Sequence, residues 1–515
     1  TSGGARLVTL VGPPGIGKSR LVWELFQQIE GGAEMVFWRQ GRSPPYGVGV
    51  TFWALADIVK AHAGVLATDS AGVVEEKLRI AVEDVVPDGS EARWIATHLA
   101  PLAGFALPRE LRGDHRTEAL AAWRRFFEAV AARDPLVLVF EDLHWADDGL
   151  LDFVSNHLVD RFEGRVLVVA TCRPELFERR SDWGTGPRAT IVEIEPLSDD
   201  ETSRLVADML DASALPEELG SALLARAGGN PLYAEEYVRM LLDRDLLRMV
   251  ETTWELSPAD LPLPESVQAI VAARLDALPR DQKALIQDAA VVGKAFWLGA
   301  LAALEGQPRW SAENHLYELE RKQLVRGERH SIVHSEPQFS FLHVIVRDVA
   351  YGQIPRSLRA EKHRRAAEWM ESLSPDRTED RAEMLAHHYA SALQYARAAG
   401  QETEALVTPA RIALRDVGDR ALSLNAFAKA ARFFADALEL WPASAPGRAE
   451  LVFRLGTARF HAESGGADLL EEARDAFLAE GRLERAAEAM LLIGELLWMR
   501  ADPDAFGLFD EAAAL

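Results

Sequence analysis

Short apolar runs alternate with segments of helical periodicity over residues 6–194. Continuous apolar runs are typical of strands buried on both faces of a parallel sheet, whereas apolar residues that recur every three or four positions indicate amphipathic helices. We expect strands at residues 6–11, 34–40, 135–140, 165–171 and 190–194. We expect helices at residues 18–29, 52–63, 71–85, 117–132 and 150–160. This alternation predicts an α/β domain with a parallel five-stranded sheet.

Helical patterns dominate the rest of the chain. Residues 198–247 read as helical with a break at Gly-Gly-Asn-Pro, and Ser198 followed by Glu201 forms a capping box that opens this segment. Short helices and two strand-like pieces, at 323–326 and 338–342, are compatible with a winged-helix domain. From residue 356 the chain is alanine-rich and helical, which predicts tetratricopeptide-like (TPR-like) helical hairpins, with a non-repetitive helical bundle as the alternative.

Composition and charge exclude several classes of protein. Lys+Arg 56 against Asp+Glu 80 gives a net charge of −24, and the densest basic stretch, at 356–365, has the spacing of a solvated helix face. We therefore expect no direct nucleic-acid binding, because an acidic chain repels phosphate. A single cysteine, Cys172, excludes a disulfide framework and fits a reducing cytoplasm. No apolar run is long enough for a transmembrane helix, so we expect a cytoplasmic protein without a membrane partner.

The most specific motif lies directly after the first expected strand. The sequence GPPGIGKS at 12–19 matches G-x-x-x-x-G-K-[ST], the P-loop, in full. Its glycines let the backbone fold round phosphate, Lys18 supplies a charge to the β and γ phosphates, and Ser19 ligates Mg²⁺. The residues expected to bind the nucleotide here are Gly12, Pro13, Pro14, Gly15, Ile16, Gly17, Lys18, Ser19 and Arg20. The expected cofactors are ATP or ADP with Mg²⁺.

Two carboxylates and an arginine complete the expected catalytic set. Glu141 and Asp142 follow the apolar strand 135–140, which we expect to neighbour the P-loop strand. One can hold Mg²⁺ and the other can polarise the attacking water, and the sequence leaves open which does which. Arg173, just past the strand at 165–171, could contact the γ-phosphate, or it could be a surface arginine that starts a loop. His144 is better explained as a structural loop residue than as a base.

These motifs together resemble a known class of ATPases. GPPGIGKS, LVFEDLHWAD, ATCRPE and GGNPLY are similar to the STAND class of signal-transduction P-loop ATPases. The segment WRQGRSPPYGVGVTFWAL, residues 38–55, resembles the ATPase region that follows the catalytic domain in actinobacterial-type adenylate/guanylate cyclases. Similar modules occur in large LuxR-type transcription regulators. The resemblance departs at Val48, where an acidic residue is common.

The resemblance implies a nucleotide-dependent switch built from four parts. These would be a P-loop NTPase domain at 1–196, a helical lid at 197–260, a winged-helix domain at 261–352 and a TPR-like repeat region at 353–515. By the same resemblance, Pro231 matches a lid motif that packs against the base or ribose. His343 occupies the place of a winged-helix histidine that contacts the β-phosphate.

The function implied is a slowly hydrolysing regulatory ATPase that controls an attached adenylate/guanylate cyclase domain. No cyclase domain lies within these residues, and the chain is expected to be part of a longer polypeptide, because it starts at Thr1 and ends in a helical pattern. Two alternatives are the sensor core of a LuxR-type regulator and a nucleotide-locked TPR scaffold with little hydrolysis. The repeats would bind a protein partner, and a nucleotide-dependent oligomer is a further expectation.

Overall fold

The protein is described here from a computed structural model. The described residues are 4–32, 34–44, 52–66, 69–105, 115–212, 219–220, 224, 227–250, 253–256, 264–328, 331, 333, 336–373 and 378–515. Val48, where the sequence departs from the related ATPase regions, lies outside them.

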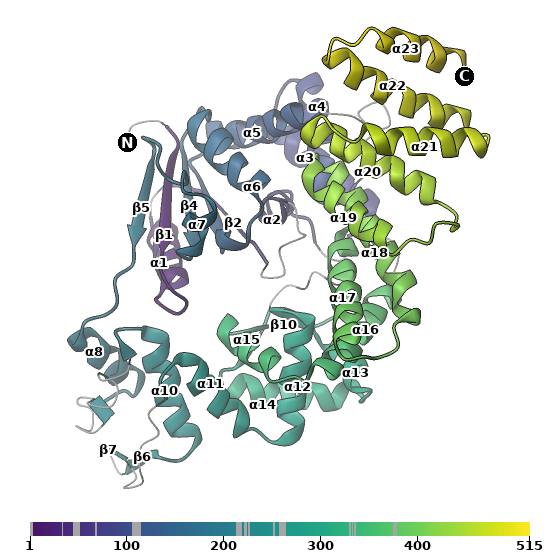
Figure 1. The fold of residues 1–515 in the computed structure, drawn as a ribbon. Helices are drawn as coiled ribbons and strands as arrows, with labels where there is room; N and C mark the ends of the chain where they lie inside the picture. Colours follow the sequence, from purple (N-terminus) through teal and green to yellow (C-terminus); the bar gives the residue numbers. More distant parts are fainter. Residues whose placement is uncertain are drawn as a thin grey trace.

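The first domain is built on the expected five-stranded parallel sheet (Figure 1). Its strands are β1 (Arg6–Val11), β2 (Phe37–Arg42), β3 (Leu136–Glu141), β4 (Val166–Cys172) and β5 (Ala189–Glu193). Their order is β2-β3-β4-β1-β5, so β3 does not neighbour the P-loop strand β1 as the sequence suggested. The strand β4 lies between them and pairs with both. Since all strands are parallel, their carboxyl ends still meet at one edge of the sheet.

Helices cover both faces of this sheet, which explains why the central strands are continuously apolar. On β3, Leu138 and Phe140 pack into the large cluster formed with α2, α3, α4 and α5, whereas Val137 and Val139 pack on the side of α1. The helices are α1 (Lys18–Glu30), α2 (Trp53–His62), α3 (Ala71–Val85), α4 (Gly89–Leu99), α5 (Arg116–Arg133), α6 (Asp148–Asp152), which continues as a π-helix at Phe153–Asp160, and α7 (Glu175–Arg179).

The next segment contains the predicted capping box and an unpredicted hairpin. Helix α8 (Asp199–Met209) begins with the reciprocal bonds of Ser198 and Glu201, and α10 (Pro231–Asp243) follows the Gly-Gly-Asn-Pro break. The expectation of a helical pattern up to residue 247 was wrong, because α10 ends at Asp243 and a strand begins at Leu247. Strands β6 (Leu247–Val250) and β7 (Thr253–Leu256) form an antiparallel hairpin, favoured by their β-branched and aromatic residues.

A small antiparallel sheet with five helices comes next. The sheet order is β8-β10-β9, with β8 (Ala295–Trp297), β9 (Val325–Gly327) and β10 (Gln338–Phe341). The two expected strands are β9 and β10, whereas β8 was not predicted, because it leads directly into α13 with no turn to separate it from the helical pattern. The helices are α11 (Val267–Asp276), α12 (Arg280–Val292), α13 (Leu298–Glu305), α14 (Arg309–Arg321) and α15 (Val344–Gly352).

The remainder is an array of helices in which each packs against the next. They are α16 (Arg356–Ser372), α17 (Thr378–Ala398), α18 (Glu404–Ser423), α19 (Phe427–Glu439), α20 (Arg448–Glu463), α21 (Ala467–Ala479), α22 (Leu483–Met499) and α23 (Asp504–Ala514). Glycines allow close contact at two of these junctions: a Cβ on Gly418 would lie 2.5 Å from the ring of Phe434, and one on Gly494 equally close to Phe509. This successive stacking supports helical repeats over a bundle.

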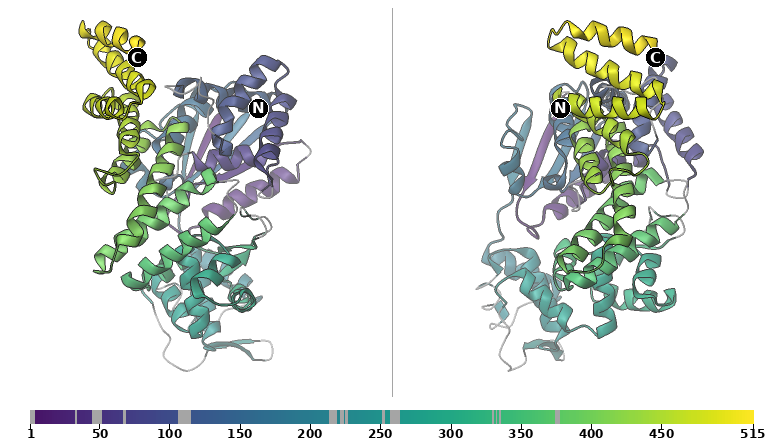
Figure 2. Two further views of the ribbon diagram at one scale, coloured as in Figure 1. Left: turned by 90° about the vertical axis from the view of Figure 1, so that its right-hand side faces the viewer. Right: turned by 45° about the vertical axis from the view of Figure 1, so that its right-hand side comes forward.

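The chain curves so that the helical array returns to the first domain (Figures 1 and 2). Arg420 of α18 donates a hydrogen bond to the carbonyl of Pro101, and Nζ of Lys429 on α19 lies 3.7 Å from a carboxylate oxygen of Asp147. Leu424 belongs to the same hydrophobic cluster as the core of the first domain. No helix within the described ranges combines the length and apolarity needed to cross a membrane.

Candidate nucleotide-binding site

The P-loop forms the turn between β1 and α1, as its sequence predicts. Gly15 and Gly17 have φ of +82° and +109°, a conformation that favours glycine over residues with a Cβ. The loop leads directly into α1, so the positive N-terminal end of this helix faces it, and Gly17 has no side chain to cap the free N–H groups there. The geometry is that of a phosphate-binding turn.

Lys18 is folded over its own loop. Its Nζ donates hydrogen bonds to the carbonyl oxygens of Gly12 at 2.7 Å and Pro13 at 2.9 Å. Burial lowers the pKa of Lys18, and the charge of Asp142 opposes this shift. The amino group therefore lies inside the loop, where the charge of Asp142 acts on it.

The two residues after Lys18 are exposed on α1. Ser19 lies at the start of the helix, where its hydroxyl is accessible. Arg20 forms an ion pair with Glu24 at 2.5 Å and lies over the ring of Trp23, so its guanidinium is held along the helix. The nucleotide contact expected for Arg20 stays a prediction.

The carboxylates Glu141 and Asp142 differ in their surroundings. Glu141 is buried and contacts Arg42, the residue directly opposite it in the parallel register of β2 and β3. Asp142 has a positive φ of 58°, and its N–H donates to Oγ1 of Thr171 at 3.0 Å. The charge of Asp142 opposes the lowering of the Lys18 pKa, so the two side chains interact electrostatically.

Arg173 and His144 lie beside this cluster. The charge of Arg173 lowers the pKa of both Lys18 and His144, and its guanidinium lies 6.0 Å from the ring centroid of Trp145. Burial lowers the pKa of His144 to about 4, so its imidazole is neutral at pH 7. A neutral His144 can exchange hydrogen bonds with a ligand, but it supplies no positive charge for phosphate.

The start of α10 is seated on the P-loop. The side-chain amide of Asn230 donates to the carbonyl of Pro14 at 3.1 Å, and the N–H of Leu232 donates to the carbonyl of Gly15 at 3.3 Å. A Cβ on Gly15 would lie 2.5 Å from Cβ of Leu232, so only glycine permits this approach. Pro231 is the first residue of α10 and therefore lies next to the P-loop. The polar contact, however, is made by Asn230, which sequence reasoning did not single out.

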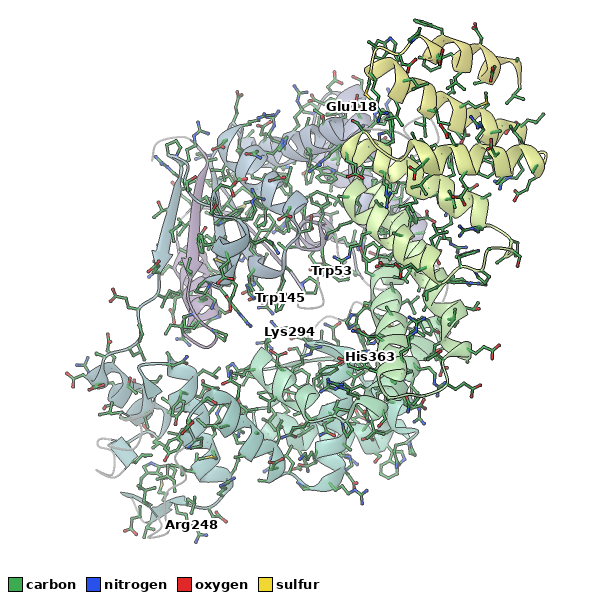
Figure 3. The ribbon with its side chains drawn as sticks, in the orientation of Figure 1. Trp53, Glu118, Trp145, Arg248, Lys294 and His363 are labelled. Atoms are coloured by element: carbon green, nitrogen blue, oxygen red, sulfur yellow. The ribbon has the colours of Figure 1, made fainter. Side chains whose placement is uncertain are left out.

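Two basic residues of the site were also missed. Arg42 ends β2 and lies 3.5 Å from Asp142 as well as contacting Glu141. Its place at the end of an expected strand could have drawn attention to it. Lys294, between α12 and β8, has its Nζ 3.9 Å from a carboxylate oxygen of Asp142 (Figure 3). No sequence motif marks Lys294, because its position depends on how the domains meet.

His343 contacts helix α10. It directly precedes α15, and its Nε2 is 4.0 Å from a carboxylate oxygen of Glu235 on α10. Burial lowers its pKa, so the imidazole is neutral at pH 7. The contacts found for His343 join α15 to the lid helix, and its expected contact with a β-phosphate stays a prediction.

Comparisons with known proteins agree with this architecture at the level of the domain. A family model described as an AAA ATPase domain matches residues 1–170. A second family model, described as a domain of unknown function, matches residues 198–252. An uncharacterized protein of Rhizobium meliloti (strain 1021) is 26% identical over 377 residues, which cover 71% of this chain and 34% of that protein. The chain thus spans a third of the length of this curated relative.

Solved structures give only distant similarities. A STAND protein with a tetratricopeptide repeat sensor from Pyrococcus horikoshii has a TM-score of 0.42 and 14% identity, over 99% of this chain and 74% of that chain. The Orc1 protein of Aeropyrum pernix, solved with DNA, has a TM-score of 0.29 and 12% identity, over 68% of this chain and 87% of that chain. Scores this low transfer no function to this chain.

The residues matched by the AAA ATPase model include the strands and the loop that form the candidate site. The AAA ATPase model spans the P-loop, the carboxylate strand β3 and most of β4. The first third of this chain is an AAA-type P-loop ATPase domain, and a mostly helical region follows it.

Proposed function

We propose that this chain is a nucleotide-dependent switch that binds ATP or ADP with Mg²⁺ and hydrolyses ATP slowly. The observation that carries the proposal is the contact of the start of α10 with the P-loop, through Asn230 and Leu232. Phosphate bound in this loop would lie directly beside the lid. A change at the γ-phosphate would therefore change the contacts that hold the lid in place.

A second contact extends this coupling beyond the lid. Asp142 lies 3.9 Å from Lys294 of the domain that contains β8, and its charge also acts on Lys18 of the P-loop. Any ligand that competes for Asp142 would weaken its attraction to Lys294. The nucleotide state would then bias how the two domains sit against each other.

The residues around the P-loop suit a magnesium nucleotide. The hydroxyl of Ser19 and the partly exposed carboxylate of Asp142 offer the oxygen ligands that Mg²⁺ prefers. When bound, Mg²⁺ neutralises charge on the phosphates. Lys18 would bind the β and γ phosphates, and Arg173 would meet the γ-phosphate from the end of β4. Slow hydrolysis is supported by the pairing of Glu141 with Arg42, since a carboxylate held by a cation is a poor base for water.

The domain boundaries are part of the proposal. We assign 1–196 to the ATPase domain, 197–260 to the lid, 261–352 to a winged helix and 353–515 to a TPR-like array. Helices α11, α12 and α14 with the sheet β8-β10-β9 support the winged helix. Because the array touches the ATPase domain through α18 and α19, a protein bound to the repeats would act on the switch directly.

The activity that the switch would control is inferred from the sequence resemblance of residues 38–55. On that basis we propose that a cyclase domain in the same polypeptide is the controlled activity, with a transcription-regulator output as the alternative. The second candidate, a nucleotide-locked scaffold, is favoured by one observation: both carboxylates are engaged by basic side chains, Glu141 by Arg42 and Asp142 by Lys294.

Single-turnover hydrolysis separates a switch from a locked scaffold. We expect measurable ATP cleavage by the purified chain and a loss of at least about 100-fold in Glu141→Gln and in Asp142→Asn, the usual range for removing a general base or charge partner. The exposed Glu163→Gln is the control and should leave the rate unchanged. The ATP affinity of each variant is then measured with and without Mg²⁺. The carboxylate whose substitution abolishes the dependence of ATP affinity on Mg²⁺ is the metal ligand. Tight ATP binding with no cleavage in the wild type would favour the scaffold.

A further inference from the structure

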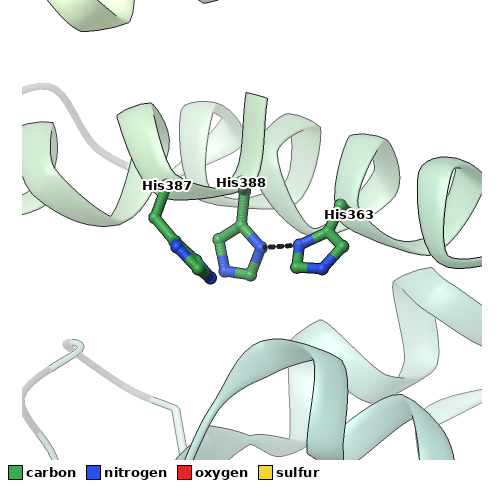
Figure 4. Close-up of side chains that lie close together, drawn as sticks. All are labelled: His363, His387 and His388. Atoms are coloured by element: carbon green, nitrogen blue, oxygen red, sulfur yellow. Dashed lines mark hydrogen bonds between the residues drawn. The ribbon is translucent and has the colours of Figure 1, made fainter. Parts of the chain in front are cut away.

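Three histidines meet where the helical array begins. His363 comes from α16, and His387 and His388 are adjacent on α17 (Figure 4). The side chains extend to the same side of the two helices, and one ligand atom from each lies within 4.8 Å of the others. His363 and His388 are both 1% exposed. No zinc-site spacing is visible in the sequence here, because His363 lies on a different helix from His387 and His388.

The spacing of these rings fits three ligands around one ion. The ring centroids are 5.1 Å apart for His363 and His388, 5.3 Å for His387 and His388, and 5.6 Å for His363 and His387. A tetrahedral zinc ion with Zn–N bonds of about 2.0–2.1 Å places its imidazole centroids about 5 Å apart. Nδ1 of His363 and Nδ1 of His388 are 2.9 Å apart, and separating them to about 3.3 Å would admit the ion between them.

Two of the rings have hydrogen-bond partners outside the cluster. Nε2 of His363 lies 2.9 Å from the hydroxyl of Tyr351, and His388 has a hydrogen bond to the backbone of Val292. Metal-binding histidines are commonly oriented by a hydrogen bond at the ring nitrogen that does not bind the metal, as Tyr351 would orient His363. Burial also lowers the pKa of all three histidines. The imidazoles are therefore neutral at pH 7, which is the form that binds metal.

Two guanidinium groups nearby oppose a cation: Arg359, which lowers the pKa of His363, and Arg347. Arg347 lowers the pKa of each of the three histidines, so its guanidinium acts on all of them. This guanidinium is itself engaged: Nη1 lies 3.2 Å from the carboxylate of Asp348, and Nε donates to the carbonyl of Ala290. Glu383, one turn before His387 on α17, lines the same cavity as His387 and supplies a negative charge on that side.

The third histidine opens the cluster to a cavity. His387 lines a cavity of about 390 Å³ at the junction of the ATPase domain, the sheet β8-β10-β9 and the helical array. Lys294 and Arg42 line the same cavity, so it reaches the residues that hold the two catalytic carboxylates. An ion at the cluster would have its remaining coordination position on the cavity side, where water or a ligand can enter.

We propose that His363, His387 and His388 form a binding site for one divalent transition-metal ion, with Zn²⁺ as the best-suited metal. Three imidazoles without a carboxylate suit Zn²⁺, Co²⁺ or Cu²⁺ and disfavour Mg²⁺ and Ca²⁺, which require oxygen ligands. The ion would fasten α16 to α17 at the start of the array. This site is independent of the P-loop and does not rest on the proposed switch.

Metal titration of the full chain tests the proposal. The protein, free of any affinity tag and of nucleotide, is stripped with a chelator, and Zn²⁺ is added in a calorimeter. We expect the wild type to bind one Zn²⁺ ion per chain. His363→Gln and His388→Gln should each weaken Zn²⁺ binding by more than about 100-fold. Loss of a hydrogen-bond partner of a ligand costs about 10–100-fold in affinity, and loss of the ligand itself should cost more. Co²⁺ should give visible ligand-field bands in the wild type that are absent from both variants. Mg²⁺ should not compete.

Two further variants keep the test decisive. Tyr351→Phe removes the partner of His363 Nε2 without removing a ligand, and it should weaken Zn²⁺ binding by about tenfold. His115→Gln is the control, because His115 precedes α5 and pairs with Glu118 outside the cluster, and it should bind Zn²⁺ as the wild type does. ATP binding and circular dichroism report whether each variant is folded. A folded wild type that binds no Zn²⁺, or that binds it equally well without His363 and His388, would show that the cluster is only a hydrogen-bonded core.

Discussion

At the scale of residues, the site is governed by a balance of charges around Asp142. Lys18 and Lys294 approach this carboxylate from two different domains, and Arg42 approaches it from β2. Each cation is partly buried, so its charge acts with less screening than at the surface. The occupancy of the P-loop and the contact between domains are therefore linked through one side chain.

Removing the P-loop lysine tests the phosphate site. Lys18→Ala should weaken Mg-ATP binding by roughly 10–150-fold, since hydrogen bonds to charged groups contribute about 1.5–3 kcal/mol. Calorimetry measures this, with Lys283→Ala as the control, because Lys283 pairs with Asp276 on the surface. An affinity unchanged in Lys18→Ala would contradict the assignment of the P-loop.

The pKa of Lys294 predicts a pH dependence near the upper physiological range. Burial lowers this pKa from 10.5 to about 8, against the attraction of Asp142 and Glu141. The folded protein then binds fewer protons than the unfolded chain between pH 8 and 10.5, so this group makes stability rise with pH there. The charge of Lys294, and with it the attraction to Asp142, is lost as pH rises through about 8.

We expect this loss to slow the release of Mg-ADP, because Lys294 then no longer competes with the bound nucleotide and its Mg²⁺ for Asp142. Stopped-flow release of a fluorescent ADP analogue with Mg²⁺ should become slower between pH 7 and pH 9 in the wild type, with a midpoint at about 8. In Lys294→Met, release should be slow and insensitive to pH over this range. A pH profile that is identical in Lys294→Met and the wild type would show that another group is responsible.

At the scale of elements, the residue before α10 both caps the helix and contacts the P-loop. Asn230 caps the helix by accepting from the N–H groups of Leu232 and Tyr233, and it also donates to the P-loop carbonyl of Pro14. Ser198 caps α8 in a comparable way, and it makes no contact with the P-loop among the interactions found. Comparing Asn230 with Ser198 therefore distinguishes the effect of losing a helix cap from the effect of losing the contact with the P-loop.

The matched variants should behave alike in stability and differently in nucleotide binding. Losing an N-cap costs about 1 kcal/mol, so Asn230→Ala and Ser198→Ala should each speed amide exchange in the first turn of their own helix by about fivefold. Only Asn230→Ala should change the rate of ADP release. Equal release rates in the two variants would remove the lid from the proposed mechanism.

At the scale of the whole molecule, the array closes back on the ATPase domain. Arg420 and Lys429 both reach it, and burial lowers the pKa of Lys429 while Asp147 opposes the shift. Asp147 is already engaged, because it accepts from the N–H groups of Phe52 and Leu150. The contact therefore joins α19 to the loop that follows Glu141 and Asp142.

Breaking this contact should open the molecule. The double substitution Arg420→Met and Lys429→Met should increase the radius of gyration measured by small-angle X-ray scattering, because the helices beyond α17 lose their polar anchors on the ATPase domain. Arg448→Met is the control, since Arg448 pairs with Glu472 within the array. If the double variant stays as compact as the wild type, the apolar contact of Leu424 is sufficient to hold the array.

Much of the first domain could be read from local patterns. The P-loop, the buried strands and the capping box of Ser198 and Glu201 are determined by neighbours in sequence, and each was found close to its expected bounds. The hairpin β6–β7 and the strand β8 were missed, although the equally short β9 and β10 were found. Strand β6 follows closely after α10 and β8 leads directly into α13, so helical patterns adjoin them. The expected place of β3 beside β1 was wrong, since strand order depends on long-range pairing.

The sequence alone determined that the chain carries a phosphate-binding loop with a pair of carboxylates, because the backbone conformation and helix start that bind phosphate are local properties. Only the tertiary structure decided which side chains face this loop. Asn230, Lys294 and Arg42 come from separate elements, and the three histidines of the proposed metal site come from two helices. Contacts of this kind depend on how buried surfaces pack together, which no single stretch of sequence contains.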